Sequence, residues 1–253
     1  MKIVISPAKS LDLERPVPTN RHSQPQFLKE AEKLNSVLLK RNPRSLARLM
    51  GISESLANVN WLRNHDFQAE HTPDNSRQAV FTFNGEVYLG LDPFTLSKEQ
   101  IDHMQDILRI LSGLYGYLKP LDLIQAYRLE MGTAIRYNRK RNLYEFWQKN
   151  ITKALNEELG DNELFINLAS KEYFKVLDTK ALKVPVITPI FKDWNKGQLK
   201  VLSFFAKKAR GRMVRYILEN KADTLDKVRN FDYDGYTYSG EHTTDPQNPV
   251  FIR

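Results

Sequence analysis

Short apolar runs alternate with amphipathic stretches along this chain, and that alternation is what most limits its fold. Lys2 to Ser6 and Leu164 to Leu168 are apolar runs of strand length, which predict buried strands. Pro25 to Leu39, Leu143 to Leu159 and Ala206 to Asn220 carry apolar residues at helical spacing and predict helices. The order is neither a strict strand–helix–strand repeat nor a block of strands followed by helices. We therefore expect an α/β fold, with a mixed sheet surrounded by helices.

Several shorter segments give further local predictions. Thr72 to Asp74 has a cap residue and a proline in the pattern of a helix start, and Ala79 to Phe83 reads as extended. Ser97 to Gln100 has the spacing of a capping box. Val184 to Lys192 and Leu199 to Phe204 predict neighbouring strands joined by a turn. Because no repeat or linker interrupts the pattern, residues 1–253 are expected to form a single domain.

A helix, a three-residue turn and a second helix are predicted from Leu46 to Ala57. Gly51 can adopt positive φ and end the first helix, and Ser53 can cap the second. The pattern resembles the helix-hairpin-helix motif, whose hairpin offers backbone N–H groups to a nucleic-acid phosphate. The third hairpin position is Ser53 where glycine is usual, and the acidic Glu54 follows it. An ordinary helical corner, with its seam in the core, is therefore the alternative.

This helical projection is expected at about residues 40–64, and basic side chains surround its turn. The DNA-binding residues predicted there are Lys40, Arg44, Arg48, Gly51, Ile52, Ser53, Ser55 and Arg63. Over the whole chain, 38 Lys and Arg residues face 30 Asp and Glu residues, for a formal net charge of +8. Such a surplus favours polyanions through the electric field and counterion release, but it does not choose between DNA, RNA, anionic lipid and phosphorylated small molecules.

The composition also excludes several classes of protein. The chain contains no cysteine, which rules out structural disulfides, thiolate metal sites and thiol-based redox chemistry. No apolar run is long enough to cross a bilayer, and the first residues do not form a secretory signal pattern. We expect a cytoplasmic protein with no membrane partner.

A second candidate site lies where polar residues follow the predicted strands. Ligands of α/β proteins bind at the ends of strands, where loops and helix N-termini converge. The residues predicted to form a cationic, anion-binding cleft are Ser6, Lys9, Ser112, Arg128, Ser170, Lys207, Lys208 and Arg210. Glu130 is the candidate proton acceptor, and so the candidate catalytic residue. Taken singly, each of these residues is explained as well by capping or by surface solvation.

Familiar catalytic and cofactor motifs are missing. The chain has no Walker-type loop, no GxGxxG, no GxSxG and no HExxH, so no cofactor is predicted. His65, Asp66, Glu70 and His71 come closest to a metal-binding cluster, but solvation of a loop explains them better. No metal site is predicted.

Several motifs together resemble the YaaA family of bacterial peroxide-stress proteins, collinearly from Met1 to Arg253. They are Ser6 to Lys9, Phe83 to Leu91, Leu111 to Asp122, Tyr127 to Gly132, Asn167 to Lys175 and Lys207 to Arg212. The resemblance implies a cytosolic protein, induced by hydrogen peroxide, that limits free iron and thereby oxidative damage to DNA and proteins. It also implies a family-specific α/β fold, a helix-hairpin-helix element, DNA binding and a positively charged cleft. The resemblance implies no defined reaction.

Two hypotheses follow. The first is a monomeric protein that binds double-stranded or structured DNA without sequence specificity and protects it under peroxide stress. The second is an enzyme acting on a phosphorylated or nucleotide-like ligand, with Lys9, Arg128, Lys207 and Arg210 holding the anion and Glu130 handling a proton.

Overall fold

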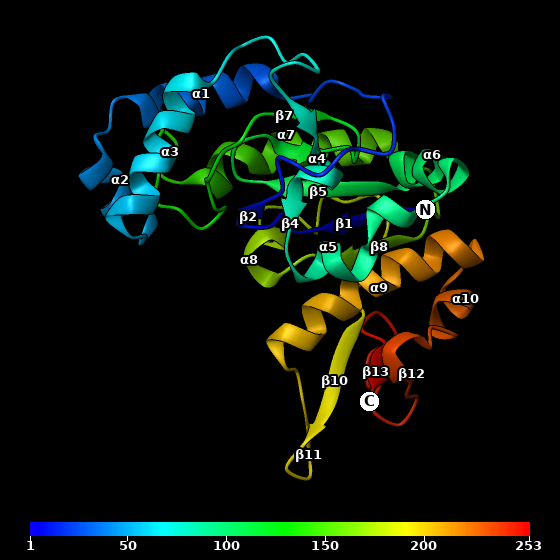
Figure 1. Ribbon diagram of the computed structural model, residues 1–253. Helices are drawn as coiled ribbons and strands as arrows, with labels where there is room; N and C mark the ends of the chain where they lie inside the picture. Colours follow the sequence, from blue (N-terminus) through cyan, green and yellow to red (C-terminus); the bar gives the residue numbers. More distant parts are fainter.

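A computed structural model describes residues 1–253 and places a five-stranded sheet at the centre of the molecule (Figure 1). The strand order is β6-β5-β1-β8-β9. The strands are β1 (Lys2–Ile5), β5 (Leu108–Ser112), β6 (Gly116–Leu118), β8 (Phe165–Leu168) and β9 (Val186–Ile187). β1 pairs in parallel with both β5 and β8, and β6 returns antiparallel to β5. The predicted mixed sheet is confirmed, with β1 as its buried central strand.

A second sheet of four strands lies beside the long helix near the C-terminus (Figure 1). Its order is β11-β10-β13-β12, from β10 (Ile190–Asn195), β11 (Gln198–Lys200), β12 (Thr237–Tyr238) and β13 (Val250–Ile252). The predicted turn between two strands is confirmed, because Trp194 of β10 pairs antiparallel with Leu199 of β11. The segment Val184 to Lys192, predicted as one strand, forms two, because Pro189 lies between β9 and β10.

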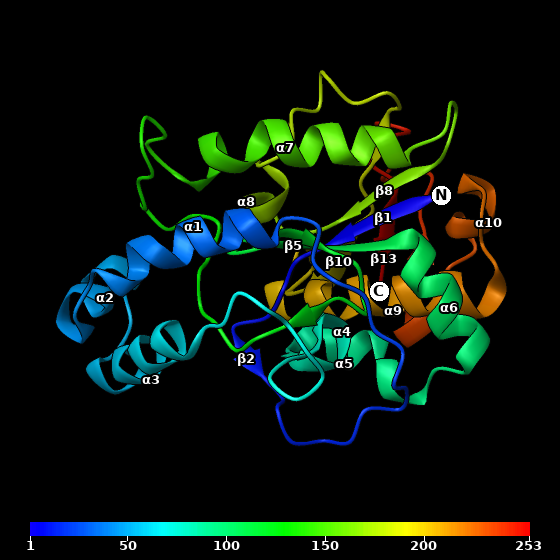
Figure 2. The ribbon, with the colours of Figure 1, turned by 90° about the horizontal axis from the view of Figure 1, so that it is seen from above.

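Helices cover both faces of the central sheet (Figure 2). They are α1 (Leu28–Leu39), α2 (Pro43–Met50), α3 (Glu54–Asp66), α4 (Ala79–Thr82), α5 (Glu86–Leu91), α6 (Lys98–Ile107), α7 (Leu143–Glu158), α8 (Lys171–Phe174), α9 (Ser203–Asn220) and α10 (Leu225–Arg229). The remaining strands are short: β2 (Ser10–Leu11), β3 (Arg77–Gln78), β4 (Phe83–Asn84) and β7 (Leu123–Ile124). α7 lies on one face, and α4, α5 and α9 lie on the other. No helix is both long and apolar enough to cross a membrane.

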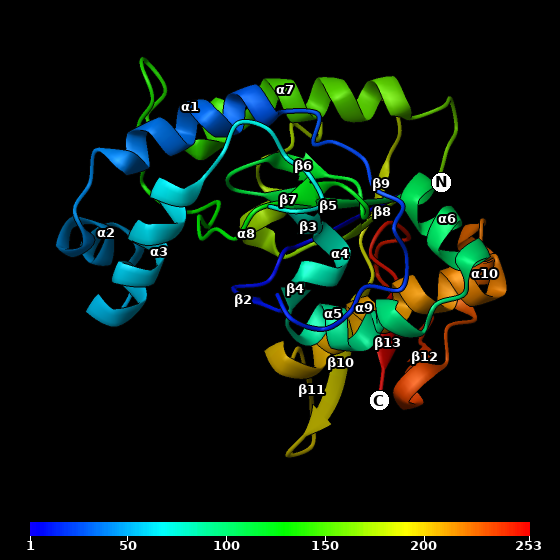
Figure 3. The same ribbon diagram turned by 45° about the horizontal axis from the view of Figure 1, so that its top comes forward.

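The helical projection forms as predicted from α2 and α3, which stand out from the body at one side (Figure 3). α1 connects it to the body, since Phe27 at its start contacts Trp147 of α7 with ring centroids 5.6 Å apart. One continuous apolar cluster runs from Ile3 of β1 to Phe251 of β13.

Local sequence cues succeed at some helix ends and fail elsewhere. The capping box is confirmed: Ser97 Oγ accepts the N–H of Gln100, whose side chain accepts the N–H of Ser97. The helix start predicted from Thr72 to Asp74 is wrong, because these residues form a turn. The extended segment predicted from Ala79 to Phe83 is also wrong, because Ala79–Thr82 forms helix α4. All four α4 side chains are buried, and this packing overrides the strand preference of Val, Phe and Thr.

Two glycines allow α5 and α9 to cross with their backbones in contact. A Cβ atom on Gly211 of α9 would overlap the carbonyl oxygen of Val87, and one on Gly90 of α5 would overlap that of Lys208. Both obstacles are helical backbone, which cannot rotate away as a side chain can. The close approach holds the first half of α9 against α5, at the edge of the central sheet where its parallel strands end.

We predict that Gly211→Ala lowers the free energy of unfolding by at least about 3 kcal/mol, because overpacking against fixed backbone forces the two helices apart. Gly240→Ala is the matched control, since a Cβ there would meet only Tyr238 at 3.9 Å. Urea unfolding followed by circular dichroism measures both variants. Equal stability of Gly211→Ala and the wild type would contradict the proposed packing role.

Candidate functional site

The carboxyl ends of the parallel strands meet at a cavity of about 410 Å³. We call it the strand-end pocket. Its walls come from the loop after β1, from the start of α5, from the segment around Glu130, from the start of α8 and from α9. The lining residues are Ser6, Pro7, Ala8, Lys9, Ser10, Asn84, Gly85, Glu86, Val87, Tyr88, Glu130, Ser170, Glu172, Tyr173, Lys207 and Arg210. Five of the eight residues predicted for the cleft, and Glu130, are therefore brought together.

Two serines fasten the ends of β1 and β8 to each other. The N–H of Ser170 donates to Ser6 Oγ at 2.9 Å, and the two hydroxyl oxygens lie 3.3 Å apart. Ser170 also caps α8 by accepting the N–H of Tyr173. Tyr88 of α5 donates its hydroxyl to the carbonyl of Ser6 at 3.1 Å. These bonds fix the floor of the pocket and leave the serine hydroxyls with little freedom.

Glu130 is held between two cations. Lys9 Nζ lies 2.7 Å from one carboxylate oxygen, and Arg128 Nη2 lies 2.9 Å from the other. The segment that carries Arg128 and Glu130 packs tightly beyond the end of β5, where Gly113 faces the carbonyl of Leu129 with no room for a side chain. Arg128 is mostly buried behind Glu130 and does not line the pocket. It therefore positions Glu130 more directly than it can contact a ligand.

The opposite wall carries two positive charges without a carboxylate partner. Lys207 and Arg210 lie one turn apart on α9, and neither forms an ion pair or a side-chain hydrogen bond. Burial lowers the pKa of the Arg210 guanidinium, the direction expected when a charge is desolvated without compensation. A ligand anion would supply the missing partner for both cations.

Two of the residues predicted for the cleft lie elsewhere. Ser112 is fully buried, where its hydroxyl bonds Tyr127 at 2.7 Å and accepts the N–H of Tyr115. Lys208 points to Asp234, at 3.8 Å, because one residue along a helix turns the side chain by about 100° from Lys207. Sequence reasoning missed the tyrosines of the pocket, Tyr88 and Tyr173. Only their positions within the quoted family motifs signalled them.

The turn between α2 and α3 has the predicted caps but fewer free donors than expected. Gly51 has φ 62° and ends α2, and Ser53 Oγ accepts the N–H of Leu56 at 3.3 Å. The amides of Gly51 and Ile52 both donate to the carbonyl of Ala47, so these two cannot serve a phosphate. The amides of Ser53, Glu54 and Ser55 have no protein acceptor, and all three residues are exposed.

The basic residues of the projection divide into two groups. Lys40, Arg44 and Arg48 are exposed and form no ion pair, and Arg44 and Arg48 are one turn apart on α2. Arg63 differs: it is half-buried and donates to Asn60 Oδ1 at 3.4 Å. Burial and, after it, the nearby charge of Arg128 lower the pKa of Arg63. Arg63 is therefore oriented toward the body of the protein more than toward solvent.

The four residues considered for a metal do not form a ligand set, and no three His, Asp or Glu side chains of the chain converge on one point. His65 is exposed and stacks on Trp61 with centroids 4.1 Å apart. His71 is buried, with Nε2 3.0 Å from the hydroxyl of Tyr115. Burial lowers the pKa of His71 to about 4. Its imidazole is therefore a neutral element of the core at physiological pH.

We predict that His71 makes stability fall between pH 7 and pH 5. In the unfolded chain the imidazole has a pKa near 6.5 and is protonated at pH 5, whereas in the folded protein it stays neutral until about pH 4. This difference lowers the free energy of unfolding by about 2 kcal/mol at pH 5. Asp122 has the opposite effect on stability, because burial raises its pKa to about 6. Between pH 7 and pH 5 the folded protein therefore binds a proton at Asp122 that the unfolded chain has lost. Comparing urea unfolding of wild type and His71→Gln at both pH values isolates the histidine. An identical pH dependence would contradict the prediction.

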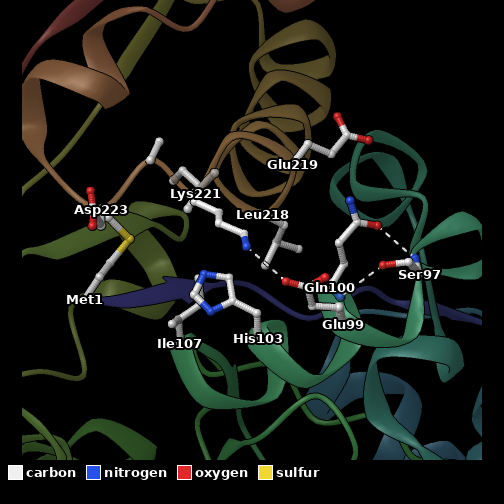
Figure 4. Close-up of a pocket in the computed structure, with 12 residues that line it drawn as sticks. Met1, Ser97, Glu99, Gln100, His103, Ile107, Leu218, Glu219, Lys221 and Asp223 are labelled. Carbon is white, nitrogen blue, oxygen red and sulfur yellow. Dashed lines mark hydrogen bonds and ion pairs between the residues drawn. The ribbon is translucent and has the colours of Figure 1, made fainter.

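A second cavity, of about 500 Å³, lies between α6 and the end of α9 (Figure 4). Lys221 pairs there with Glu99 at 3.0 Å, and Glu219 is engaged by Arg215. Charged groups around this cavity thus have ion-pair partners in the protein, whereas Lys207 and Arg210 of the strand-end pocket have none. The strand-end pocket is the better candidate for an anionic ligand.

Fold and site together define a mixed α/β protein with a pocket at its strand ends, lined by three basic and three acidic side chains, and a helical projection with exposed basic residues. The chain belongs to the family described as peroxide stress protein YaaA, whose model matches residues 1–242. A UPF0246 protein of Flavobacterium johnsoniae is 57% identical over 238 residues, 94% of each chain. One from Shewanella pealeana is 51% identical over 255 residues, covering all of this chain and 99% of its own. The family resemblance drawn from the motifs is confirmed.

Proposed function

We propose that this protein binds double-stranded or structured DNA without sequence specificity through the projection formed by α2 and α3. The observation that carries the proposal is the exposed turn itself, where the free amides of Ser53, Glu54 and Ser55 start a helix of 13 residues. Unpaired amides and the helix dipole favour a phosphate at that point. Lys40, Arg44 and Arg48, all exposed and unpaired, supply further phosphate contacts.

Binding of this kind would also explain how a peroxide stress protein protects DNA. Lysine and arginine side chains that neutralise DNA phosphates release the cations condensed on them, ferrous ions included. Hydroxyl radicals that form from peroxide and ferrous iron act where the iron is bound. Displacing iron from the backbone therefore limits iron-dependent damage to DNA even though the chain presents no metal-binding cluster of its own.

We predict that Arg48→Glu combined with Gly51→Asp weakens duplex binding at least about tenfold at 0.1 M salt, because both changes place negative charge beside the phosphate. The matched control is Arg48→Gln with Gly51→Asn, which has nearly the same shape, no new negative charge and a residue that tolerates positive φ. Gel shifts on unrelated duplexes at several salt concentrations measure both, with circular dichroism as a check of folding. Equal binding by the acidic and neutral variants would refute the role of the turn.

A second candidate function rests on the strand-end pocket. Lys207 and Arg210 lack partners on one wall, and Glu130 lies on the other with Lys9 beside it. We propose that the pocket binds a phosphorylated or nucleotide-like ligand, the cations holding its anion while Glu130 accepts or returns a proton. DNA binding by the projection would then bring the enzyme to its place of action.

We predict that Glu130→Gln retains duplex binding and fold but fails to protect cells from peroxide, because the amide keeps the shape of the carboxylate and cannot take up the proton. Glu86→Gln is the control, since Glu86 lines the same pocket without an ion pair. Survival of a deletion strain carrying each variant is compared in peroxide. Full protection by Glu130→Gln would exclude a catalytic Glu130 and leave the DNA proposal intact.

A further inference from the structure

The exposed aromatic side chains of this chain lie on strand β10 and in the first turn of α9. Trp194, Phe204 and Phe205 are 58%, 59% and 41% exposed, and every other Phe, Tyr and Trp is buried or half-buried. We call these three residues the aromatic edge. Trp194 lies on β10 and the two phenylalanines lie in the first turn of α9, so they flank β11, the edge strand of its sheet. The β10–β11 ribbon projects from the body (Figure 1).

The rings of the aromatic edge are presented on both faces of the ribbon. Trp194 pairs across the ribbon with Leu199, while the preceding Asp193 points to the opposite, buried face. Arg253 binds Asp193 with Nη2 at 2.6 Å and lies over the ring of Phe205, 4.7 Å from its centroid. Phe205 is therefore on the Asp193 side, and Trp194 is on the other. A flat partner surface cannot cover both sides, whereas a flexible chain can wrap around the edge.

The same segment is rich in cations. Ile190 to Arg212 contains seven lysines and arginines, of which Lys208 and Arg212 pair with Asp234. Its single acid is Asp193, whose carboxylate is already engaged by Arg253 and by the hydroxyl of Tyr236. Lys196 at the turn and Lys200 on the edge strand are exposed and form no ion pair. The complementary ligand is a flexible polyanion that carries flat apolar groups of its own. Single-stranded nucleic acid fits that description, while a duplex keeps its bases stacked inside.

We propose that the aromatic edge binds single-stranded nucleic acid, with unpaired bases stacked on Trp194, Phe204 and Phe205 and phosphates beside the lysines. This site is separate from the α2–α3 turn and does not depend on duplex binding there. Lys207 follows the aromatic edge on α9 and lines the strand-end pocket. The first turns of α9 therefore connect the aromatic edge with the strand-end pocket.

The test compares an oligothymidylate with an abasic strand of the same length, which has the same phosphates and no bases. Wild type should bind the abasic strand at least about tenfold more weakly, as measured by fluorescence anisotropy. Trp194→Leu and Phe204→Leu should each weaken oligothymidylate binding by roughly tenfold, because leucine keeps apolar area but offers no ring. Trp194→Phe should retain the affinity. Val201→Ala is the control, an exposed aliphatic position after the same strand.

Equal affinity for the two strands, or unchanged oligothymidylate binding by the leucine variants, would overturn the proposal. A membrane contact would be indicated instead by two results together. The protein and its leucine variants would co-sediment equally with phosphatidylserine vesicles, and the wild type would bind the two strands with equal affinity. The Arg48→Glu, Gly51→Asp variant should bind oligothymidylate as wild type does. Failure of the duplex proposal and failure of this one therefore appear in different variants and on different strands.

Discussion

The close crossing of α5 and α9 is the contact on which the strand-end pocket depends. Gly90 and Gly211 let the two backbones touch, and this contact fixes which turns of α9 face the ends of the parallel strands. Lys207 and Arg210 consequently stand opposite Glu130, which reaches the pocket from a segment packed against Gly113. If the two helices were farther apart, the same residues would be present in the chain without the pocket between them.

Periodicity predicted most of the regular structure, because long amphipathic patterns have only one good burial solution. The helices α1, α7 and α9, the strands β1 and β8 and the α2–α3 turn all follow from it. Prediction failed where packing outweighed local preference. Three of the four residues of α4, Val80, Phe81 and Thr82, favour a strand by composition. The amides of Ala79 and Val80 nevertheless donate to the carbonyls of Asp122 and Pro120, contacts that no local pattern reveals.

The candidate site was predictable in part for a topological reason. Residues that follow parallel strands reach the same edge of a sheet, so Ser6 and Ser170 could be placed together from the sequence. Orientation around a helix is harder to infer, and Lys208 was misplaced beside Lys207 for that reason. The depth of a residue could not be inferred either, because Ser112 ends β5 but is buried under Tyr127 and Tyr115 and does not reach the pocket.

The ion pair between Lys9 and Glu130 links the entry of an anion into the strand-end pocket to the contacts of the Glu130 carboxylate. An incoming anion competes for the ammonium group of Lys9, which is largely exposed and held to the protein by that one carboxylate. Once the ammonium turns to the anion, the Glu130 carboxylate keeps only its ion pair with Arg128 and is left facing the bound ligand. Filling the pocket would thus uncover a carboxylate that the Lys9 ammonium otherwise covers.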